Sequence, residues 1–214
     1  MKKNKKSLHV DAEQAILMFQ EGSPLIIVDD EDRENEGDVA IPAQYCTSNM
    51  VNFMAKEARG LICTPLDAEI AEKLNLNLMT GEAEDAIENT AFTVTVEAAT
   101  GITTGISAKD RARTIQVLAD QESSAKDLVK PGHVFPLKAR EGGVLVRAGQ
   151  TEASVDLCKM AGLYPVAVIC EIMKDDGEMA RMDDLEEFAD KHKMKIITVE
   201  ELISYRMKQE RMIK

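Results

Sequence analysis

Residues 24–43 read PLIIVDDEDRENEGDVAIPA, two apolar runs on either side of a strongly acidic loop. The runs PLIIV and VAIPA have the length and the β-branched content of buried strands. The ten residues between them, 29–38, hold seven carboxylates, one arginine, one amide and one glycine. Two strands joined by such a loop indicate a sheet with a concentration of charge at one of its ends.

Outward from this pair, short apolar runs alternate with amphipathic segments along the chain. Strands are predicted at residues 60–66, 91–98, 142–149, 164–173 and 195–199, with an extended segment at 131–139. Helices are predicted at residues 10–20, 48–58, 67–75, 107–120, 151–162, 182–193 and 200–212. The pattern indicates an α/β fold in a single domain with a mixed sheet rather than a purely doubly wound one, antiparallel near the acidic loop and around residues 91–96.

The ends of the elements follow from a few polar residues and glycines. Asp11, Ser107 and Thr151 stand at predicted helix N-caps, and Gly162 stands at a predicted helix stop. The domain prediction has a basic disordered tail at residues 1–9, one domain at residues 10–205 and the charged end of the last helix at residues 206–214. Residues 79–90 are polar and are predicted to be a loop.

Composition excludes several classes of function. The net charge of −12 argues against a nucleic-acid partner, which requires a basic face. The longest apolar runs are too short to span a bilayer, so no membrane partner is expected. The cysteines are widely spaced, without a CxxC pair, and indicate reduced thiols in a cytoplasmic protein: Cys46, Cys63, Cys158 and Cys170. A small anion remains possible where a few Arg or Lys converge.

The acidic loop has three interpretations. A solvated charge run is the ordinary one. A calcium loop of the EF-hand type is excluded, because Ala43 occupies position 12, where the bidentate glutamate belongs. The third is an active-site loop, in which Arg33 holds a substrate oxygen and Glu34 ligates a hard divalent ion such as Mg²⁺. The third interpretation requires an anion site and a proton-transfer group elsewhere in the chain.

A candidate anion site lies in VRAGQTEAS, residues 146–154. Arg147 stands at the end of a predicted strand, a glycine turn follows, and Thr151 stands at a helix start. Backbone N–H groups at a helix N-terminus bind anions together with a nearby arginine. A plain strand–turn–helix junction is the alternative.

Two further residues are candidates for proton transfer. His133, in PGHVFP, lies between two prolines at the edge of an apolar strand and could act as an acid or base near neutral pH. Glu171 ends a strongly apolar strand, where a lone carboxylate is costly unless it is paired or performs chemistry. Cys63 is most simply a small buried residue, with a substrate-facing thiol as the alternative.

With these residues identified, the chain resembles the 3,4-dihydroxy-2-butanone 4-phosphate synthase family of riboflavin biosynthesis. The similarity spans residues 10–205 and rests on long motifs: DDEDRENEGD, ARGLICTPL, TAFTVTVEA, TGISAKDRARTI, PGHVFPLKAREGGVLVRAG, TEASVDLCKMAGLYPVAVICEI and DDGEMAR. The closing SYRMKQERMIK resembles the segment that joins this domain to GTP cyclohydrolase II in fused enzymes.

The resemblance implies a lyase that converts D-ribulose 5-phosphate into 3,4-dihydroxy-2-butanone 4-phosphate and formate with Mg²⁺ or Mn²⁺. It implies a compact single-domain α/β sandwich and a homodimer with active sites at the subunit interface. His133, from the neighbouring subunit, and Glu171 would transfer protons, and Glu34 would also ligate the metal. The substrate-binding residues would be Arg33, Glu34, Asp38, Arg147, Ala148, Gly149, Gln150, Thr151 and Glu171.

One letter departs from the family pattern. The family's usual text is GHTEA, whereas this chain has GQTEA, with Gln150 where the resemblance places a metal-ligating histidine. A glutamine offers an amide oxygen to Mg²⁺ but no imidazole nitrogen. Weaker metal binding and reduced turnover are expected. Either Gln150 leaves a catalytically impaired phosphosugar-binding or regulatory homologue, or water or another carboxylate completes the metal shell.

Overall fold

The computed structural model describes residues 8–80 and 90–212, and its strands form one mixed sheet in the order β4-β5-β3-β6-β2-β1-β7. β1 pairs antiparallel with β2 and parallel with β7, and β3 pairs parallel with β5. β4 runs antiparallel to β5, so the predicted mixed sheet is confirmed. The strands are β1 (Leu25–Val28), β2 (Gly37–Pro42), β3 (Cys63–Leu66), β4 (Val96–Ala98), β5 (Leu128–Lys138), β6 (Ala167–Glu171) and β7 (Lys195–Thr198).

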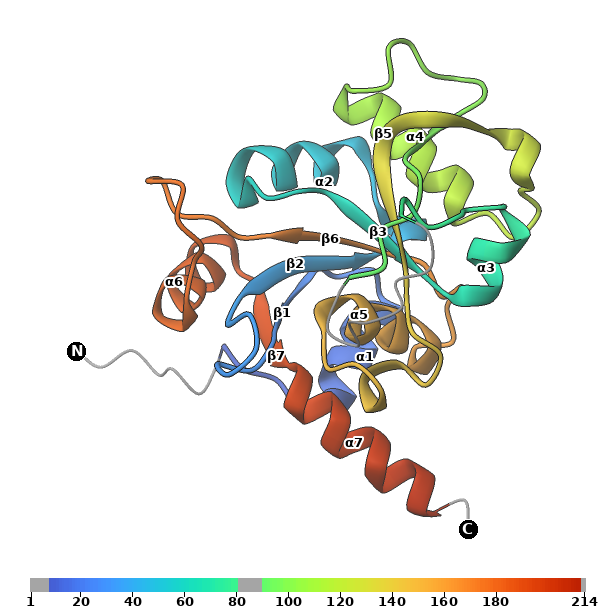
Figure 1. Cartoon of the computed structure of the whole chain (residues 1–214). Coiled ribbons are helices and arrows are strands. Elements are labelled where there is room, and N and C mark those ends of the chain that lie inside the picture. Colours follow the sequence, from blue (N-terminus) through green and yellow to red (C-terminus); the bar gives the residue numbers. More distant parts are fainter. Residues whose placement is uncertain (1–7, 81–89, 213–214) are drawn as a thin grey trace.

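Helices cover both faces of this sheet, which makes the predicted sandwich (Figure 1). One face carries α2 (Ser48–Phe53), α3 (Ala68–Lys73), α4 (Ala108–Leu118) and α6 (Met182–His192). The other carries α1 (Ala12–Gln20), α5 (Gln150–Met160) and α7 (Val199–Met212). The strand β1 shows why both faces need a helical layer. Ile26 and Val28 pack into the hydrophobic core on the first face, and Leu25 and Ile27 pack into the core on the second. Successive side chains of a strand point to opposite faces, so a strand buried on both faces is apolar throughout.

Several predicted helix ends are confirmed. The Asp11 carboxylate accepts the backbone N–H of Gln14 at 2.9 Å, and the Ser107 hydroxyl accepts that of Asp110 at 3.0 Å. Gly162 follows α5 with a φ of +70°, the left-handed conformation that ends many helices. The polar residues therefore supply the acceptors that the first turns of these helices require.

The prediction of a strand at residues 142–149 is wrong. Residues Gly143–Leu145 form a short 3-10 helix (η5), because Gly142 and Gly143 both take positive φ values, +91° and +63°. The Asp156 carboxylate on α5 accepts the Val144 N–H at 2.9 Å and holds this turn. A Cβ at Gly143 would lie 2.2 Å from Asp156 Oδ1, so this close approach requires a glycine.

The start of α5 also differs from the prediction. The helix begins at Gln150, and Gly149 rather than Thr151 is its N-cap residue. Thr151 lies within the first turn and is 4% exposed. The shift matters for function, because it leaves the backbone at the helix start uncovered by a capping side chain.

Other parts of the prediction have a more limited outcome. The strand expected at 91–98 shortens to β4, with Thr93 making an isolated bridge to Leu78. Residues 1–7 of the predicted tail and residues 81–89 of the predicted polar loop lie outside the described residues.

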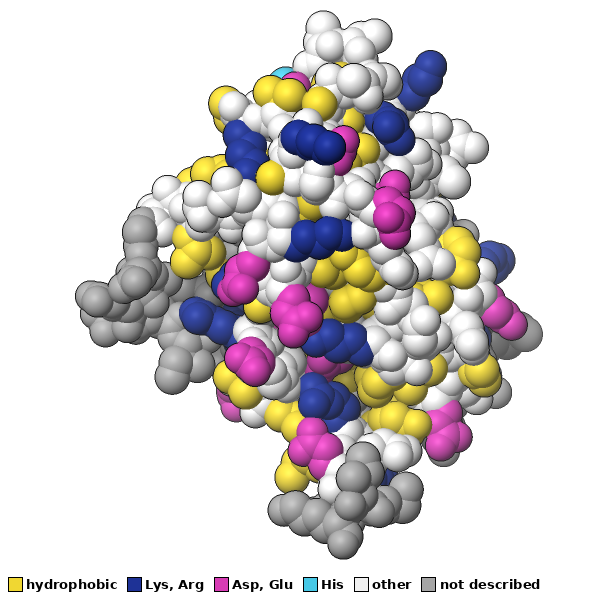
Figure 2. Space-filling model, turned by 90° about the vertical axis from the view of Figure 1, so that its right-hand side faces the viewer, with side chains coloured by type: hydrophobic (Ala, Val, Ile, Leu, Met, Phe, Trp, Pro, Cys, Tyr) yellow, Lys and Arg dark blue, Asp and Glu magenta, His cyan; other side chains and the backbone are white. Residues whose placement is uncertain are grey.

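Within residues 8–80 and 90–212, no helix combines the length and the apolar character that a membrane span requires. The face seen in Figure 2 intersperses Lys and Arg with Asp and Glu, so the net charge of −12 is not gathered there.

Candidate active site

The pairing of β2 with β6 places two carboxylates side by side. Asp38 is the register partner of Glu171, at the end of an antiparallel ladder between buried strands. Asp38 is 4% exposed, although it directly follows the exposed acidic loop. Directly opposed residues of neighbouring strands have Cβ atoms about 5 Å apart on the same face. The fold itself therefore brings together two acids that are distant in the sequence.

These two carboxylates line a cavity of about 290 Å³. Its lining includes six of the predicted site residues: Glu34, Asp38, Arg147, Gln150, Thr151 and Glu171. Cys63 lines it too, together with apolar groups from β5 and β6. The cavity thus combines carboxylates, a buried arginine and the first turn of α5, as the anion-site interpretation requires.

Three more predicted residues lie at the edge of this cavity. The Arg33 guanidinium donates to the amide oxygen of Gln150 at 3.2 Å and lies 2.9 Å from a Glu34 carboxylate oxygen. Ala148 and Gly149 form the turn that leads from Arg147 into α5. A Cβ at Gly149 would lie 2.4 Å from Arg147 Nη1 and 3.2 Å from Arg33 Nη2. Glycine at this position lets two guanidinium groups approach the helix start.

Asp29 organises the acidic loop, a role that was missed in the sequence. Its carboxylate accepts the N–H of Glu36 at 2.8 Å, the N–H of Glu34 at 3.1 Å and the Arg33 guanidinium at 2.7 Å. The side chain is fully buried. An aspartate directly after a strand commonly binds the backbone a few residues on, and this signal could have identified Asp29. The loop is therefore folded around one acid rather than held apart by many.

Arg147 is held by a buried ion pair. Its guanidinium lies 2.6 Å from the Glu152 carboxylate, with the two side chains 4% and 1% exposed, and it donates to the Thr90 hydroxyl at 2.8 Å. Glu152 also accepts the N–H of Arg140 at 3.0 Å. A charge-assisted pair in a dry environment fixes the orientation of the guanidinium. Glu152, like Asp29, was not among the predicted site residues.

Burial changes the acidity of the cavity's ionisable groups. Loss of solvation raises the pKa of Asp38 well above its usual range, and the facing Glu171 carboxylate raises it further. Burial also raises the pKa of Glu171, although N–H donors such as that of Leu61, at 2.8 Å, oppose the shift. The pKa of the Cys63 thiol is raised by burial and by the same two carboxylates, which keeps it protonated. Two interacting acids of this kind can retain a proton and exchange it near neutral pH.

Asp38→Asn is expected to stabilise the cation-free protein at neutral pH by on the order of 1 kcal/mol, because it removes a buried charge that faces another carboxylate. Folding raises the pKa of Asp38 above its value in the unfolded chain. The stability that the protonated Asp38 contributes is therefore fully present at low pH and is lost as the pH rises through the folded pKa. The variant's gain should therefore grow upward from about pH 4. Urea unfolding with a chelator, from about pH 4 to about pH 8, measures it.

Asp175→Asn is the matched control, since Asp175 has a 93% exposed side chain and its surface pair contributes little. A gain for Asp38→Asn that does not change with pH, or a loss at every pH, would contradict the assignment of a costly buried charge.

His133 lies outside this cavity in the single chain. It is on β5 with its side chain 46% exposed, and its Nδ1 contacts the Glu97 carboxylate on β4. Leu137, further along β5, lines the cavity, whereas His133 lies several residues before it on the same strand and does not. The predicted contribution of His133 to a neighbouring subunit's site therefore remains a prediction.

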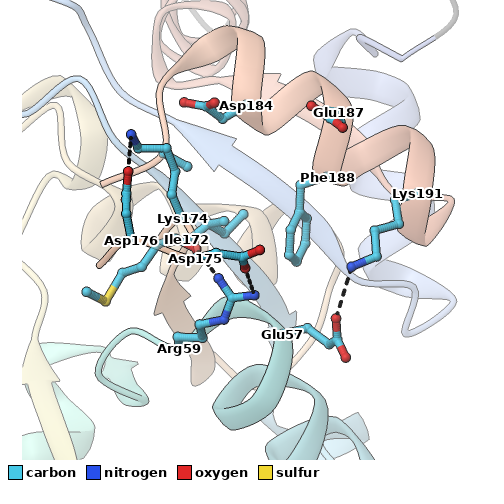
Figure 3. Close-up of a pocket in the computed structure, with 12 residues that line it drawn as sticks. Glu57, Arg59, Ile172, Lys174, Asp175, Asp176, Asp184, Glu187, Phe188 and Lys191 are labelled. Atoms are coloured by element: carbon cyan, nitrogen blue, oxygen red, sulfur yellow. Dashed lines mark hydrogen bonds and ion pairs between the residues drawn. The ribbon is translucent and has the colours of Figure 1, made fainter. Parts of the chain in front are cut away.

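A second cavity, of about 410 Å³, lies between α6 and the end of β6 (Figure 3). Its cationic side chains each face a carboxylate: Arg59 faces Asp175, Lys174 faces Asp176 and Lys191 faces Glu57. The lining also holds Asp184 and Glu187, so carboxylates outnumber cations there, and none of the predicted site residues lines this cavity. The first cavity is the better candidate for the active site.

The oxygen atoms around the first cavity suit a hard divalent ion. Glu34 offers a carboxylate that is 47% exposed, and Gln150 offers an amide oxygen. Mg²⁺ is commonly bound by only one or two carboxylates, with water completing its shell. No group of three or more His, Cys, Asp or Glu side chains is poised to hold a metal ion in the described part of the chain. The residues fit Mg²⁺ and do not form a complete protein cage.

A mixed sheet between two helical layers, with carboxylates and a buried arginine beside a helix start, defines an α/β protein with a polar candidate site at the sheet edge. The chain belongs to the 3,4-dihydroxy-2-butanone 4-phosphate synthase family, whose sequence profile matches residues 13–205. A synthase of that name from Neisseria meningitidis serogroup A is 56% identical over 192 residues, or 90% of this chain and 53% of the relative. Riboflavin biosynthesis protein RibBA of Aquifex aeolicus is 55% identical, covering 94% of this chain and 50% of the relative.

Solved structures agree with the family and the fold. A 3,4-dihydroxy-2-butanone 4-phosphate synthase in complex with two magnesium ions superposes with a TM-score of 0.88 at 39% identity, covering 94% of this chain and 98% of that one. The two-domain synthase RibBX of A. baumannii also superposes with a TM-score of 0.88, at 48% identity, covering 92% of this chain and 58% of that one. The chain spans about half the length of the curated relatives described above.

Proposed function

We propose that this chain converts D-ribulose 5-phosphate into 3,4-dihydroxy-2-butanone 4-phosphate and formate, a lyase reaction of riboflavin biosynthesis. The observation that carries the proposal is the single cavity in which Asp38 and Glu171 face each other beside Arg147 and the start of α5. Family membership and the magnesium-bound neighbour support it. The cavity's size suits a five-carbon sugar phosphate better than a larger cofactor.

The phosphate would be bound at the start of α5. Helix N-termini present unpaired N–H groups and a partial positive charge to anions. Gly149 supplies no capping side chain there, and Thr151 adds a hydroxyl within the cavity. Arg147 supplies a fixed positive charge and Arg33 a second one at the edge of the cavity. At this end of the cavity, two guanidinium groups therefore lie close to the backbone of a helix start.

Proton transfer falls to the carboxylate pair. The reaction begins with loss of a proton next to a ketone and continues through enediol-type species, so it needs groups that both accept and donate protons. The raised pKa values of Asp38 and Glu171 suit that alternation near neutral pH. In a homodimer, His133 of a second copy would add a further acid or base. Glu34, on the acidic loop, would contact the substrate's hydroxyl groups.

Mg²⁺ would be held by oxygen atoms of Glu34 and Gln150, and Mn²⁺ by the same set. When bound, the ion supplies a positive charge that polarises the substrate carbonyl. Gln150 itself is 5% exposed and points its amide oxygen at Arg33, at 3.2 Å, while its amide nitrogen donates to the Glu36 carbonyl at 3.3 Å. Both ends of the amide thus have partners within the chain.

Because both ends of the Gln150 amide are hydrogen-bonded within the chain, a second function is also a candidate. If the amide stays bound to Arg33 and Glu36, the metal lacks one ligand, and the chain would bind the sugar phosphate with little turnover. Such a protein would be a catalytically impaired phosphosugar-binding or regulatory homologue. The cavity and its anion-binding end would be retained in either case.

A formate assay on the unmodified chain and on Gln150→His separates the two functions. We expect both proteins to release formate from ribulose 5-phosphate with Mg²⁺, with kcat/KM about 10-fold or more higher for the variant, since an imidazole adds a metal ligand. The advantage should be larger with Mn²⁺, which accepts nitrogen ligands more readily. Gln116→His, on the exposed face of α4, is the control.

The outcomes are distinct. Release of formate only by the variant would establish the impaired homologue, and calorimetry should then show ribulose 5-phosphate binding to the unmodified chain. No formate from either protein would refute the lyase function.

A further inference from the structure

We propose that Glu97 is a positioning residue for His133, holding the imidazole with its proton on Nδ1 and leaving Nε2 as the unprotonated nitrogen. The inference deepens the proposed function, because it concerns how His133 would be prepared for proton transfer. It rests on the contact between the Glu97 carboxylate and His133 Nδ1, and on the way in which β4, β5 and two glycines build that contact.

An irregularity in the sheet creates the contact. Val96 is paired with Val134 on β5, but the next residue, Glu97, is paired with Val129. The segment of β5 between these two partners, which contains His133, therefore bulges out of the ladder. Bulges re-aim side chains and are common next to functional sites. Here the bulge turns His133 toward Glu97, whose side chain is only 18% exposed.

Two glycines leave the space that this pair needs. A Cβ at Gly105 would lie 1.6 Å from Glu97 Oε1 and 2.8 Å from His133 Nδ1, and one at Gly132 would lie 2.4 Å from Glu97 Cγ. Gly105 also has a φ of +92°, which other residues rarely adopt. Its N–H donates to the buried Asp110 carboxylate at 3.1 Å. The loop that carries Gly105 is thus tied down against the pair.

The chemistry of the contact determines the tautomer. A carboxylate only accepts hydrogen bonds, so the imidazole nitrogen that faces it must carry the proton. In a neutral ring the other nitrogen, Nε2, then has the free lone pair. The carboxylate fixes both the tautomer and the ring orientation, as the partners of ligating and catalytic histidines do. Because 46% of the His133 side chain is exposed, the imidazole can still meet a substrate or a second copy of the chain.

Ring ¹⁵N spectra of the intact protein test the tautomer without any assay. The chain has only three histidines, so a His133→Gln variant identifies the signal. The spectra are recorded at about pH 8, where a free imidazole is neutral. We expect the ring proton of His133 to be on Nδ1. Glu97→Ala should return it to the Nε2–H form that free histidine prefers, while Glu97→Gln, which keeps an accepting oxygen, should preserve the Nδ1–H form.

Formate kinetics supply a second readout. Glu97→Ala should lower kcat about 10- to 100-fold with little change in KM, and Glu97→Gln should recover most of the loss. An Nε2–H ring in the unmodified chain, or a tautomer unchanged in Glu97→Ala, would overturn the proposal. If the unmodified chain releases no formate, the proposed function fails, and the spectra still decide the role of Glu97. Should Glu97→Ala not fold, Glu97→Met keeps most of the side-chain volume, removes the accepting oxygens and is read by the same spectra.

Discussion

Glu171→Gln is expected to lower formate release by about 10²- to 10⁴-fold while leaving the fold intact. The substitution removes the ability of this side chain to exchange a proton. Its amide oxygen can still accept the Leu61 N–H, which the carboxylate now accepts at 2.8 Å. The structural role of the side chain is therefore retained, and the loss should fall on kcat rather than on substrate binding.

The measurement is steady-state formate production with Mg²⁺, paired with urea unfolding to verify stability. Glu122→Gln, at an exposed position away from the cavity, is the control and should keep full activity. A Glu171→Gln enzyme within a factor of about ten of the unmodified one would remove Glu171 from the proton-transfer machinery. The proton would then have to pass through Asp38 or His133.

Glu152→Ala is expected to destabilise the protein by about 3–5 kcal/mol, the largest stability effect predicted for this chain. The cause is the Arg147 guanidinium, which would remain buried without its closest carboxylate. Removing one member of a buried pair costs more than removing both, because an isolated charge cannot leave the dry interior. For a chain of this size the melting temperature should fall by about 2–4 °C for each kcal/mol.

A double variant separates the cost of the orphaned charge from the loss of packing. Arg147→Met combined with Glu152→Leu should recover most of the lost stability, since apolar groups of similar volume replace the pair. The same double variant should lose affinity for the substrate phosphate, because it lacks the guanidinium. Glu72→Ala removes an exposed partner of Lys138 and should cost less than about 1 kcal/mol. A double variant no more stable than Glu152→Ala would assign the loss to packing alone.

Much of the site was predictable because its residues carry local signals. Charge between two apolar runs identified Arg33 and Glu34, and a carboxylate at the end of an apolar strand identified Glu171. Arg147 and Thr151 were predicted from a strand–turn–helix pattern of which only the turn and the helix are present. The error has a physical source: Val144 and Val146 have strand propensity, but two glycines and the Asp156 carboxylate turn the backbone there.

The sequence by itself determined the layered α/β fold, because apolar periodicity shows which residues avoid water and with which period. Only the tertiary structure decided the pairs: Asp38 with Glu171, Arg147 with Glu152, and Glu97 with His133. Strand register and bulges set these pairs, and register depends on the packing of the whole sheet rather than on any one segment. The sequence shows that a charged residue in an apolar segment needs a partner, because burying it alone is costly. Which residue becomes that partner depends on the tertiary structure.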